Sequence, residues 1–238
     1  MGRAPLWTAI RDTLQEEIAR GQYRPGDKLP TEARFSERFG VNRHTIRRAL
    51  ADLAAGGFVV SRRGAGVYVA HAQTTYPLGR RVRFHQSLSA LGKAPAKQAL
   101  SLEERAADLA EADALAITVG AKVCVYEGLS LADDVPIAVF RSVFSAERFP
   151  RLKALLSETP SVTAALRAHG VDDYVRASTE VTAKRASSTI STHLRIAPGD
   201  PILRTVSINV DSENRPIEYG RTWFAGDRVS FTVGEGSA

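Results

Sequence analysis

Residues Phe39 to Val69 pair a short basic helix with a glycine-tipped hairpin, and this combination restricts the fold of the N-terminal region more than any other feature. The apolar residues of the helix recur at intervals of three and four positions, which predicts a single buried stripe. These residues are Ile46, Ala49, Leu50 and Leu53. Gly40 forms a turn before the helix, and Asn42 is placed to cap its N-terminus. The stripe requires partner elements to cover it.

The segment upstream supplies those partners. A first helix is predicted from Leu6 to Ile18, where apolar residues step at intervals of four until Gly21. The turn that follows contains the breaker pair Pro25-Gly26, and Thr31 then caps a second, short helix. Helix, helix, turn, helix and hairpin in this order are typical of a winged helix-turn-helix module, which binds DNA.

Three motifs within residues 4 to 70 match one family. They are PGDKLPTE at 25–32, FGVNRHTIRRAL at 39–50 and RRGAG at 62–66. On these motifs the segment resembles the N-terminal domain of the GntR-type bacterial transcription regulators. The resemblance implies binding to double-stranded operator DNA. Because winged modules of this type act on two half-sites about one helical turn apart, we expect a homodimer on a near-palindromic operator.

Positive charge is concentrated in the same region. Residues 1 to 70 hold 12 Lys and Arg against 7 Asp and Glu, a net charge of +5, whereas residues 71 to 238 hold 20 against 19, a net charge of +1. This asymmetry favours a polyanionic partner, because contacts to phosphates release condensed counterions. A basic surface that is merely solvated is the alternative.

The first turns of the basic helix, the helix before it and the hairpin tip carry the candidate DNA-binding side chains. Those expected to contact base edges are Arg43, His44, Thr45 and Arg47. Those expected to contact phosphates are Arg34, Asn42 and Arg48. Those at the hairpin tip, suited to the minor groove, are Arg62, Arg63 and Gly66. The alternative for any one arginine is solvation or pairing with an acidic neighbour.

The pattern changes after Val69. Residues 70–77 are small and polar, so we divide the chain into a DNA-binding domain (1–70), a linker (71–77) and a second domain (78–238). Helices are predicted at Phe84–Leu91, Arg105–Leu115, Arg148–Leu156, Ser161–His169 and Ser187–Arg195. Strands are predicted at Val123–Ala132, Ile137–Ser145, Tyr174–Ala183, Ile202–Asp211, Pro216–Phe224 and Val229–Val233. Hairpin turns between strands imply antiparallel pairing, so the second domain is predicted to be α+β.

The second domain also resembles a known effector domain. The segments that carry the resemblance are Tyr126–Pro136, Leu194–Pro201 and Arg215–Phe231. They are similar to the UTRA effector domain of the HutC branch of GntR regulators, which shares its fold with chorismate lyase. Within that branch, residues 76–92 and 217–229 look most like the regulators of phosphonate metabolism. The resemblance implies a small-molecule effector, with an anionic, phosphonate-related compound as the expected class.

Six residues are candidates for effector binding. They are Arg83, His85, Ser161, Arg176, Glu218 and Phe224. Side chains alternate along a strand, so Glu218 and Phe224 share one face, and the resemblance implies that this face meets the effector. Ser161 is placed to cap a helix whose free N–H groups would attract an anion. Each has a structural alternative, since a capping serine can merely cap and Glu218 can pair with Arg204 or Arg221.

The chain departs from the resembled family at one set of positions. Sugar-phosphate-sensing members carry an Arg-x-Arg pair and a glutamate on the strands of the central hairpin, where this chain has Gly128, Ser130 and Phe140. This departure argues against a hexosamine phosphate as the effector. A phosphonate, a phosphate ester or another small anion still suits the remaining arginine and histidine candidates.

Three classes of function are compatible with these features. A ligand-responsive transcriptional repressor is the interpretation we favour, with a lyase-like enzyme that uses the second domain as the alternative. The chain has no metal-ligand spacing, no G-x-S-x-G motif and no phosphate-binding glycine loop, so we expect no metal, no cofactor and no catalytic residue. A non-specific architectural DNA binder is disfavoured by the near-neutral second domain.

The expected location is the cytoplasm, with the protein on the nucleoid when DNA is bound. The single cysteine, Cys124, lies in an apolar run and can form no internal disulfide, which fits a reducing compartment. No apolar run approaches the ~20 residues that span a membrane, so no membrane association is expected.

Overall fold

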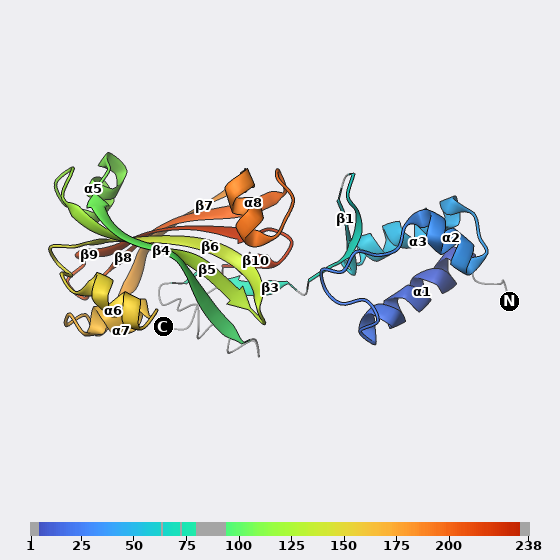
Figure 1. Ribbon diagram of the computed structural model, residues 1–238, viewed down its shortest axis with the longest axis horizontal. Coiled ribbons are helices and arrows are strands. Elements are labelled where there is room, and N and C mark those ends of the chain that lie inside the picture. Colours follow the sequence, from blue (N-terminus) through green and yellow to red (C-terminus); the bar gives the residue numbers. More distant parts are fainter. Residues whose placement is uncertain (1–4, 63, 72, 80–93, 234–238) are drawn as a thin grey trace. The chain divides into compact units, whose positions relative to one another are not determined.

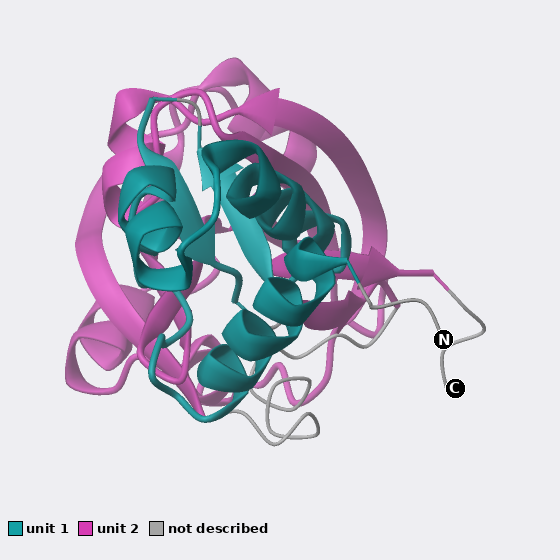
Figure 2. Cartoon of the chain, turned by 90° about the vertical axis from the view of Figure 1, so that its right-hand side faces the viewer, with its two compact units in different colours: residues 1–72 teal, residues 73–238 magenta. Residues whose placement is uncertain are grey.

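The computed structural model describes residues 5–62, 64–71, 73–79 and 94–233. The chain forms two compact units, Met1–Ala72 (unit 1) and Gln73–Ala238 (unit 2), which Figure 2 shows in teal and magenta. Each unit has its own hydrophobic core. The two units are therefore described separately.

Unit 1 contains three helices around one core. They are α1 (Leu6–Ala19), α2 (Glu32–Phe39) and α3 (Arg43–Ala55). Leu14, Phe35 and Ile46, one from each helix, are fully enclosed in this core. The hydroxyl of Thr31 accepts a hydrogen bond from the backbone of Arg34 and caps α2, as the sequence predicts. Gly40, with a φ of 64°, ends α2 and turns the chain into α3.

A hairpin completes unit 1. Strands β1 (Val59–Arg62) and β2 (Gly66–Val69) pair antiparallel. The N–H groups of Gly26 and Leu29 donate to the carbonyls of Val69 and Val67 over 2.9 and 2.8 Å. These bonds attach the proline-containing turn to the hairpin, which is the wing of the module, so the helices and the wing form one unit. The predicted winged helix-turn-helix is confirmed.

Unit 2 is built on a six-stranded antiparallel sheet. Its strands are β4 (Pro95–Ala106), β5 (Lys122–Ala132), β6 (Val135–Ser145), β7 (Val175–Arg185), β8 (Pro201–Val210) and β9 (Pro216–Ala225). Their order is β4-β5-β6-β9-β8-β7, so two three-stranded meanders join where β6 pairs with β9 (Figure 1). Asp133 and Asp134, both with positive φ, make the predicted turn between β5 and β6. The predicted antiparallel α+β fold is confirmed.

Short helices cover both faces of the sheet (Figure 1). They are α5 (Leu109–Leu115), α6 (Leu152–Glu158), α7 (Val162–Arg167) and α8 (Ser188–Leu194). Helices α6 and α7 pack on the face that holds Tyr126 and Phe144, both fully buried. The opposite face, which holds Val125 and Leu129, packs against α5 at one end and α8 at the other. Side chains of successive residues in β5 thus reach different cores.

The stretch predicted to be a linker contains a strand. Thr74–Pro77 forms β3, which pairs in parallel with β10 (Val229–Thr232). Thr74 and Tyr76 are buried, and the Tyr76 ring packs against Phe224 with ring centroids 5.6 Å apart. The segment contains mostly small and polar residues, because the strand is short and only alternate side chains, those of Thr74 and Tyr76, face the core. The structure of unit 2 therefore begins before residue 78.

Other predicted elements also differ from the structure. Strand β4 was not predicted, because as an edge strand it exposes most of its polar side chains and lacks an alternating pattern. The helix predicted from Arg105 begins only at Leu109, because Asp108 and Glu111 form a capping box that fixes its start. The helix predicted at Phe84–Leu91 lies outside the described residues.

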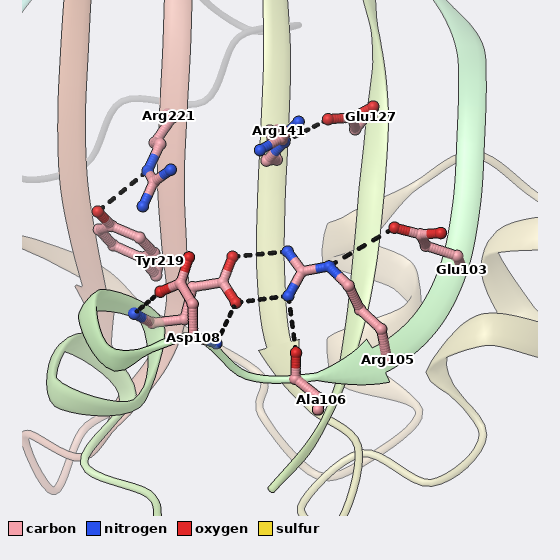
Figure 3. Close-up of polar contacts among 9 residues, drawn as sticks. Glu103, Arg105, Ala106, Asp108, Glu127, Arg141, Tyr219 and Arg221 are labelled. Carbon is pink, nitrogen blue, oxygen red and sulfur yellow. Dashed lines mark hydrogen bonds and ion pairs between the residues drawn. The ribbon is translucent and has the colours of Figure 1, made fainter. Parts of the chain in front are cut away.

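A buried ion pair ties the start of α5 to the end of β4 (Figure 3). The carboxylate of Glu111 is inaccessible to solvent and accepts two hydrogen bonds of 2.7 Å from the guanidinium of Arg105. It also accepts a bond from the backbone N–H of Asp108. The bonds from Arg105 lower the pKa of Glu111 despite its burial. Glu103 lies 3.6 Å from the same guanidinium but is exposed.

We expect Glu111→Gln to reduce the free energy of unfolding of unit 2 by about 2 to 3 kcal/mol, because a charged hydrogen-bond pair is lost in a buried site. Since the folded-state pKa of Glu111 is lowered, its contribution is present above the ordinary glutamate pKa and is lost as pH falls. The difference from wild type should therefore shrink below about pH 4. Urea denaturation at several pH values measures this.

The matched control is Glu103→Gln, which removes an exposed partner of the same arginine. It should change stability by no more than about 0.5 kcal/mol. Equal effects of the two substitutions would contradict the assigned role of burial.

Candidate functional site

The N-terminal turn of α3 is capped and presents polar side chains to solvent. Asn42 accepts hydrogen bonds from the backbone N–H and the hydroxyl of Thr45, at 2.9 and 3.0 Å. Arg43 and His44 are exposed and have no ion-pair partner among the described residues. The cap stabilises the first turn of α3, so the backbone that carries these side chains is held in a fixed conformation. The predicted N-cap role of Asn42 is confirmed.

Arg47 is held in place by a carboxylate from the preceding helix. Its Nε and Nη2 atoms donate to the two oxygens of Glu32 at 3.1 and 2.8 Å. Hydrogen bonding to Arg47 lowers the pKa of Glu32 and raises that of Arg47. The pair is exposed, so it contributes little stability but orients a planar guanidinium next to Arg43. The pairing with Glu32, one alternative raised by the sequence, is thus present for Arg47.

The candidate phosphate-binding residues lie around this turn. Arg34 is exposed on α2, and its backbone N–H is used in the α2 cap. The Arg48 guanidinium lies 4.7 Å from the centre of the Trp7 ring, which belongs to α1. A cation–π contact leaves the guanidinium N–H groups free to donate in the ring plane. Arg48 is therefore both attached to the helical core and exposed.

The turn before α2 places beside the β1–β2 hairpin, the wing, a residue that the sequence did not indicate. The side chain of Lys28 lies against Gly66. Gly66 has a φ of 110°, a backbone conformation that favours glycine. The Arg62 guanidinium lies 4.6 Å from the centre of the Tyr68 ring. Arg63 lies outside the described residues.

Unit 2 contains a cavity of about 340 Å³ on the sheet face covered by α6 and α7. Four of the six candidate effector residues line it. They are Ser161, Arg176, Glu218 and Phe224. The strand alternation that places Glu218 and Phe224 on one face is therefore confirmed. Arg83 and His85 lie outside the described residues.

Glu218 is fixed at the floor of this cavity. Its carboxylate accepts hydrogen bonds from the hydroxyl of Ser142 at 2.5 Å and from the amide of Asn209 at 2.7 Å. The other end of the same amide, Asn209 Oδ1, accepts a long bond of 3.5 Å from Arg176 Nε. Ser142 and Asn209 are buried. Neither Arg221 nor another arginine of the described chain forms an ion pair with Glu218.

Polar groups from separate elements complete the lining. Ser161 caps α7 by accepting from the backbone N–H of Ala164 at 3.3 Å, which confirms its capping role. The hydroxyls of Thr163 and Tyr174 lie 3.1 Å apart. Tyr76 of β3 also lines the cavity, so the strand missed in the presumed linker contributes to the site.

Lys97 is a charged cavity residue that the sequence analysis missed. It lies on β4, is half-buried, and its Nζ atom is 4.9 Å from the centre of the Phe140 ring. Burial lowers its pKa, which the charge of Glu218 partly opposes. If β4 and its register against β5 had been predicted, Lys97 would have been placed opposite Ser130, which lines the cavity. No group of three metal-ligating side chains occurs in the described part of the chain.

A winged helix-turn-helix followed by a cavity-bearing α+β unit defines the class of ligand-responsive DNA-binding regulators. The chain belongs to the GntR family of bacterial regulatory proteins, whose sequence model matches residues 6–69. The model of the UTRA domain matches residues 90–230. An uncharacterized HTH-type transcriptional regulator of Rhizobium meliloti (strain 1021) is 37% identical over 229 residues, covering 96% of this chain and 94% of the relative.

Two other relatives extend the comparison. The mannosyl-D-glycerate transport/metabolism system repressor MngR of Escherichia coli (strain K12) is 29% identical over 238 residues, covering 98% of this chain and 97% of the relative. The crystal structure of PhnF from Mycobacterium smegmatis matches with a TM-score of 0.65 and 27% identity, covering 96% of this chain and all of that one. The sequence relatives are named as transcriptional regulators rather than enzymes.

We expect Arg43→Ala and Arg47→Ala each to weaken binding to a specific operator by about 5- to 150-fold, because a bidentate contact to a base edge is worth about 1–3 kcal/mol. Thermal stability should change little, since both side chains are exposed. The operator can be selected from random-sequence duplexes and the affinity measured by fluorescence anisotropy.

The control is Arg20→Ala, which removes an exposed arginine that pairs with Glu16 at the end of α1. It should leave operator affinity unchanged. Wild-type affinity in both α3 variants would refute the assignment.

Proposed function

We propose that the protein is a sequence-specific transcriptional repressor whose operator binding is released by a small anionic molecule. The observation that carries the proposal is the presence, in one chain, of a capped and exposed basic helix and of a separate cavity with unpaired charges. The helix supplies DNA contacts through Arg43, His44, Thr45 and Arg47, supported by Arg34, Asn42 and Arg48. The wing adds Arg62, Arg63 and Gly66. The repressor MngR, a relative over nearly its whole length, supports this direction of control.

The DNA-bound form is a homodimer on a near-palindromic operator. One α3 reads only a few base pairs, and two copies related by a two-fold axis read half-sites about 34 Å apart. The DNA-binding domain is residues 1–70, and effector binding and dimerisation belong to the second domain, which includes strand β3 (Thr74–Pro77) as well as residues 78–238. The protein acts in the cytoplasm, at the nucleoid. None of the described helices is long and apolar enough to cross a membrane.

The effector binds in the unit 2 cavity. Arg176, Ser161, Glu218 and Phe224 offer it a cation, a hydroxyl, an acceptor and an aromatic surface. Arg83 and His85 are further candidates. A phosphonate or phosphate ester is the class we favour, because the sequence resembles regulators of phosphonate metabolism and the cavity is too small for a large ligand.

Coupling between the cavity and unit 1 runs through β3. Unit 1 ends at Ala72, and Tyr76, four residues later, already lines the cavity. A ligand that contacts Tyr76 differently in two states of the chain would bias the connection to the DNA-binding unit. Differential contact of this kind is required for any ligand to change DNA affinity.

We expect the purified protein to bind a selected operator as a dimer and at least one phosphonate or phosphate ester to release it. Analytical ultracentrifugation gives the stoichiometry, and anisotropy with a panel of such compounds gives the release. A monomer on DNA, or equal affinity for unrelated sequences, would contradict the proposal. A ligand that strengthens operator binding would overturn the repressor direction alone.

A further inference from the structure

We propose that Lys97 is the principal anion-binding residue of the unit 2 cavity and that the ligand is a small anion that also donates a hydrogen bond, from a hydroxyl or an ammonium group, to Glu218. This inference rests on the proposed ligand-binding role of the cavity. It adds a residue and a ligand polarity to that role.

The first support is that Lys97 lacks a counterion. Among the residues that the structure describes, no carboxylate lies within ion-pair distance of its ammonium group. Its nearest charged influence, Glu218, is engaged by Ser142 and Asn209 instead. A half-buried cation without an ion-pair partner is destabilising, because the lost hydration is not replaced by a direct contact with an anion. Such a residue is typical of a site that awaits an anion.

The second support is the way in which the ammonium group is held. The Phe140 ring is buried, and Lys97 Nζ lies 4.9 Å from its centre. Phe140 can occupy this position because residue 128 is glycine: a Cβ there would lie 2.7 Å from the ring and 2.5 Å from the Gln98 carbonyl oxygen. The ring surface stabilises the cation from one side only. Lys97 and Phe140 both line the cavity.

The third support is the distribution of charge around the cavity. Lys97 comes from β4 and Arg176 from β7, the two edge strands of the sheet, and Glu218 from β9 between them. None of the three is paired with another, so the lining carries a net positive charge with a fixed acceptor in the middle. A ligand with an anionic group and a separate hydrogen-bond donor would match both the positive charge and the acceptor. A neutral ligand would leave two cations without counterions.

The test compares wild type with Lys97→Met and Lys97→Arg in the full chain. The probes are 2-hydroxyethylphosphonate, methylphosphonate, which lacks the donor, and the neutral diol ethylene glycol. Binding is measured by isothermal titration calorimetry, and thermal unfolding is followed with and without each probe. We expect the hydroxylated phosphonate to bind best and ethylene glycol not to bind. Lys97→Met should lose at least about tenfold in affinity for both anions, and Lys97→Arg should retain most of it.

A second readout separates ligand binding from a structural role. If Lys97 serves the ligand, Lys97→Met should unfold at a higher temperature than wild type without ligand, because an unpaired charge is removed, while the anion-induced rise disappears. The control is Lys184→Met, which removes an exposed lysine of β7 outside the cavity and should change neither quantity.

Several results would overturn the inference. Wild-type anion affinity in Lys97→Met, or a wild type that responds to neither anion, would do so, and equal affinity for the two phosphonates would remove the role of Glu218. Operator binding is measured on the same samples. Its persistence in any of these cases would show that the DNA-binding regulator stands while the assignment of Lys97 fails.

Discussion

The pairing of β6 with β9 is the interaction on which the unit 2 cavity depends. It joins two meanders that are each local in sequence, and it sets Ser142 opposite Gly220, which brings the Ser142 hydroxyl to the carboxylate of Glu218. The neighbouring β8–β9 register sets Asn209 opposite Glu218. Because side chains alternate strictly, a slip of one residue in either pairing would turn Glu218 away from the cavity. The site is therefore a consequence of sheet register, which the hydrophobic cores on both faces enforce.

The treatment of charge differs between the cavity and the rest of unit 2. Buried carboxylates elsewhere are satisfied: Glu111 by Arg105, and Asp211 by the backbone of Arg215 and the guanidinium of Arg148. Burial alone would raise the pKa of Asp211, but these hydrogen bonds lower it to about 2. The cavity charges Lys97, Arg176 and Glu218 form no ion pair within the described chain, and the hydrogen bonds of Glu218 and Arg176 go to the neutral side chains of Ser142 and Asn209. The fold forms ion pairs at its structural charges but leaves the three charged side chains of one cavity without an ion pair. This arrangement lowers the stability of the fold, which is typical of a binding site.

The sequence predicts the parts of this protein whose signals are local. Caps at Thr31, Asn42 and Ser161 follow from side chains that can reach a nearby N–H, and the α3 stripe follows from helical spacing. Strand alternation was enough to place Glu218 and Phe224 on one face, which is the face that lines the cavity. Edge strand β4 gave no such signal, because most of its polar side chains are exposed and do not alternate with apolar ones, and Lys97 was missed with it. Strand β3 was missed because its pairing partner, β10, lies about 150 residues away in sequence.

The distance in sequence between β3 and β10 also bears on regulation. Residues of β3 follow directly after unit 1, yet their position depends on a strand near the C-terminus and on the aromatic contacts of Tyr76 with Phe224 and Phe231. Phe224 belongs to β9 and lines the cavity. A ligand that displaced Phe224 or Tyr76 would therefore act on the segment that continues the chain from unit 1. The free energy with which it could favour one arrangement of this cluster is limited to the difference in its affinity for the two arrangements.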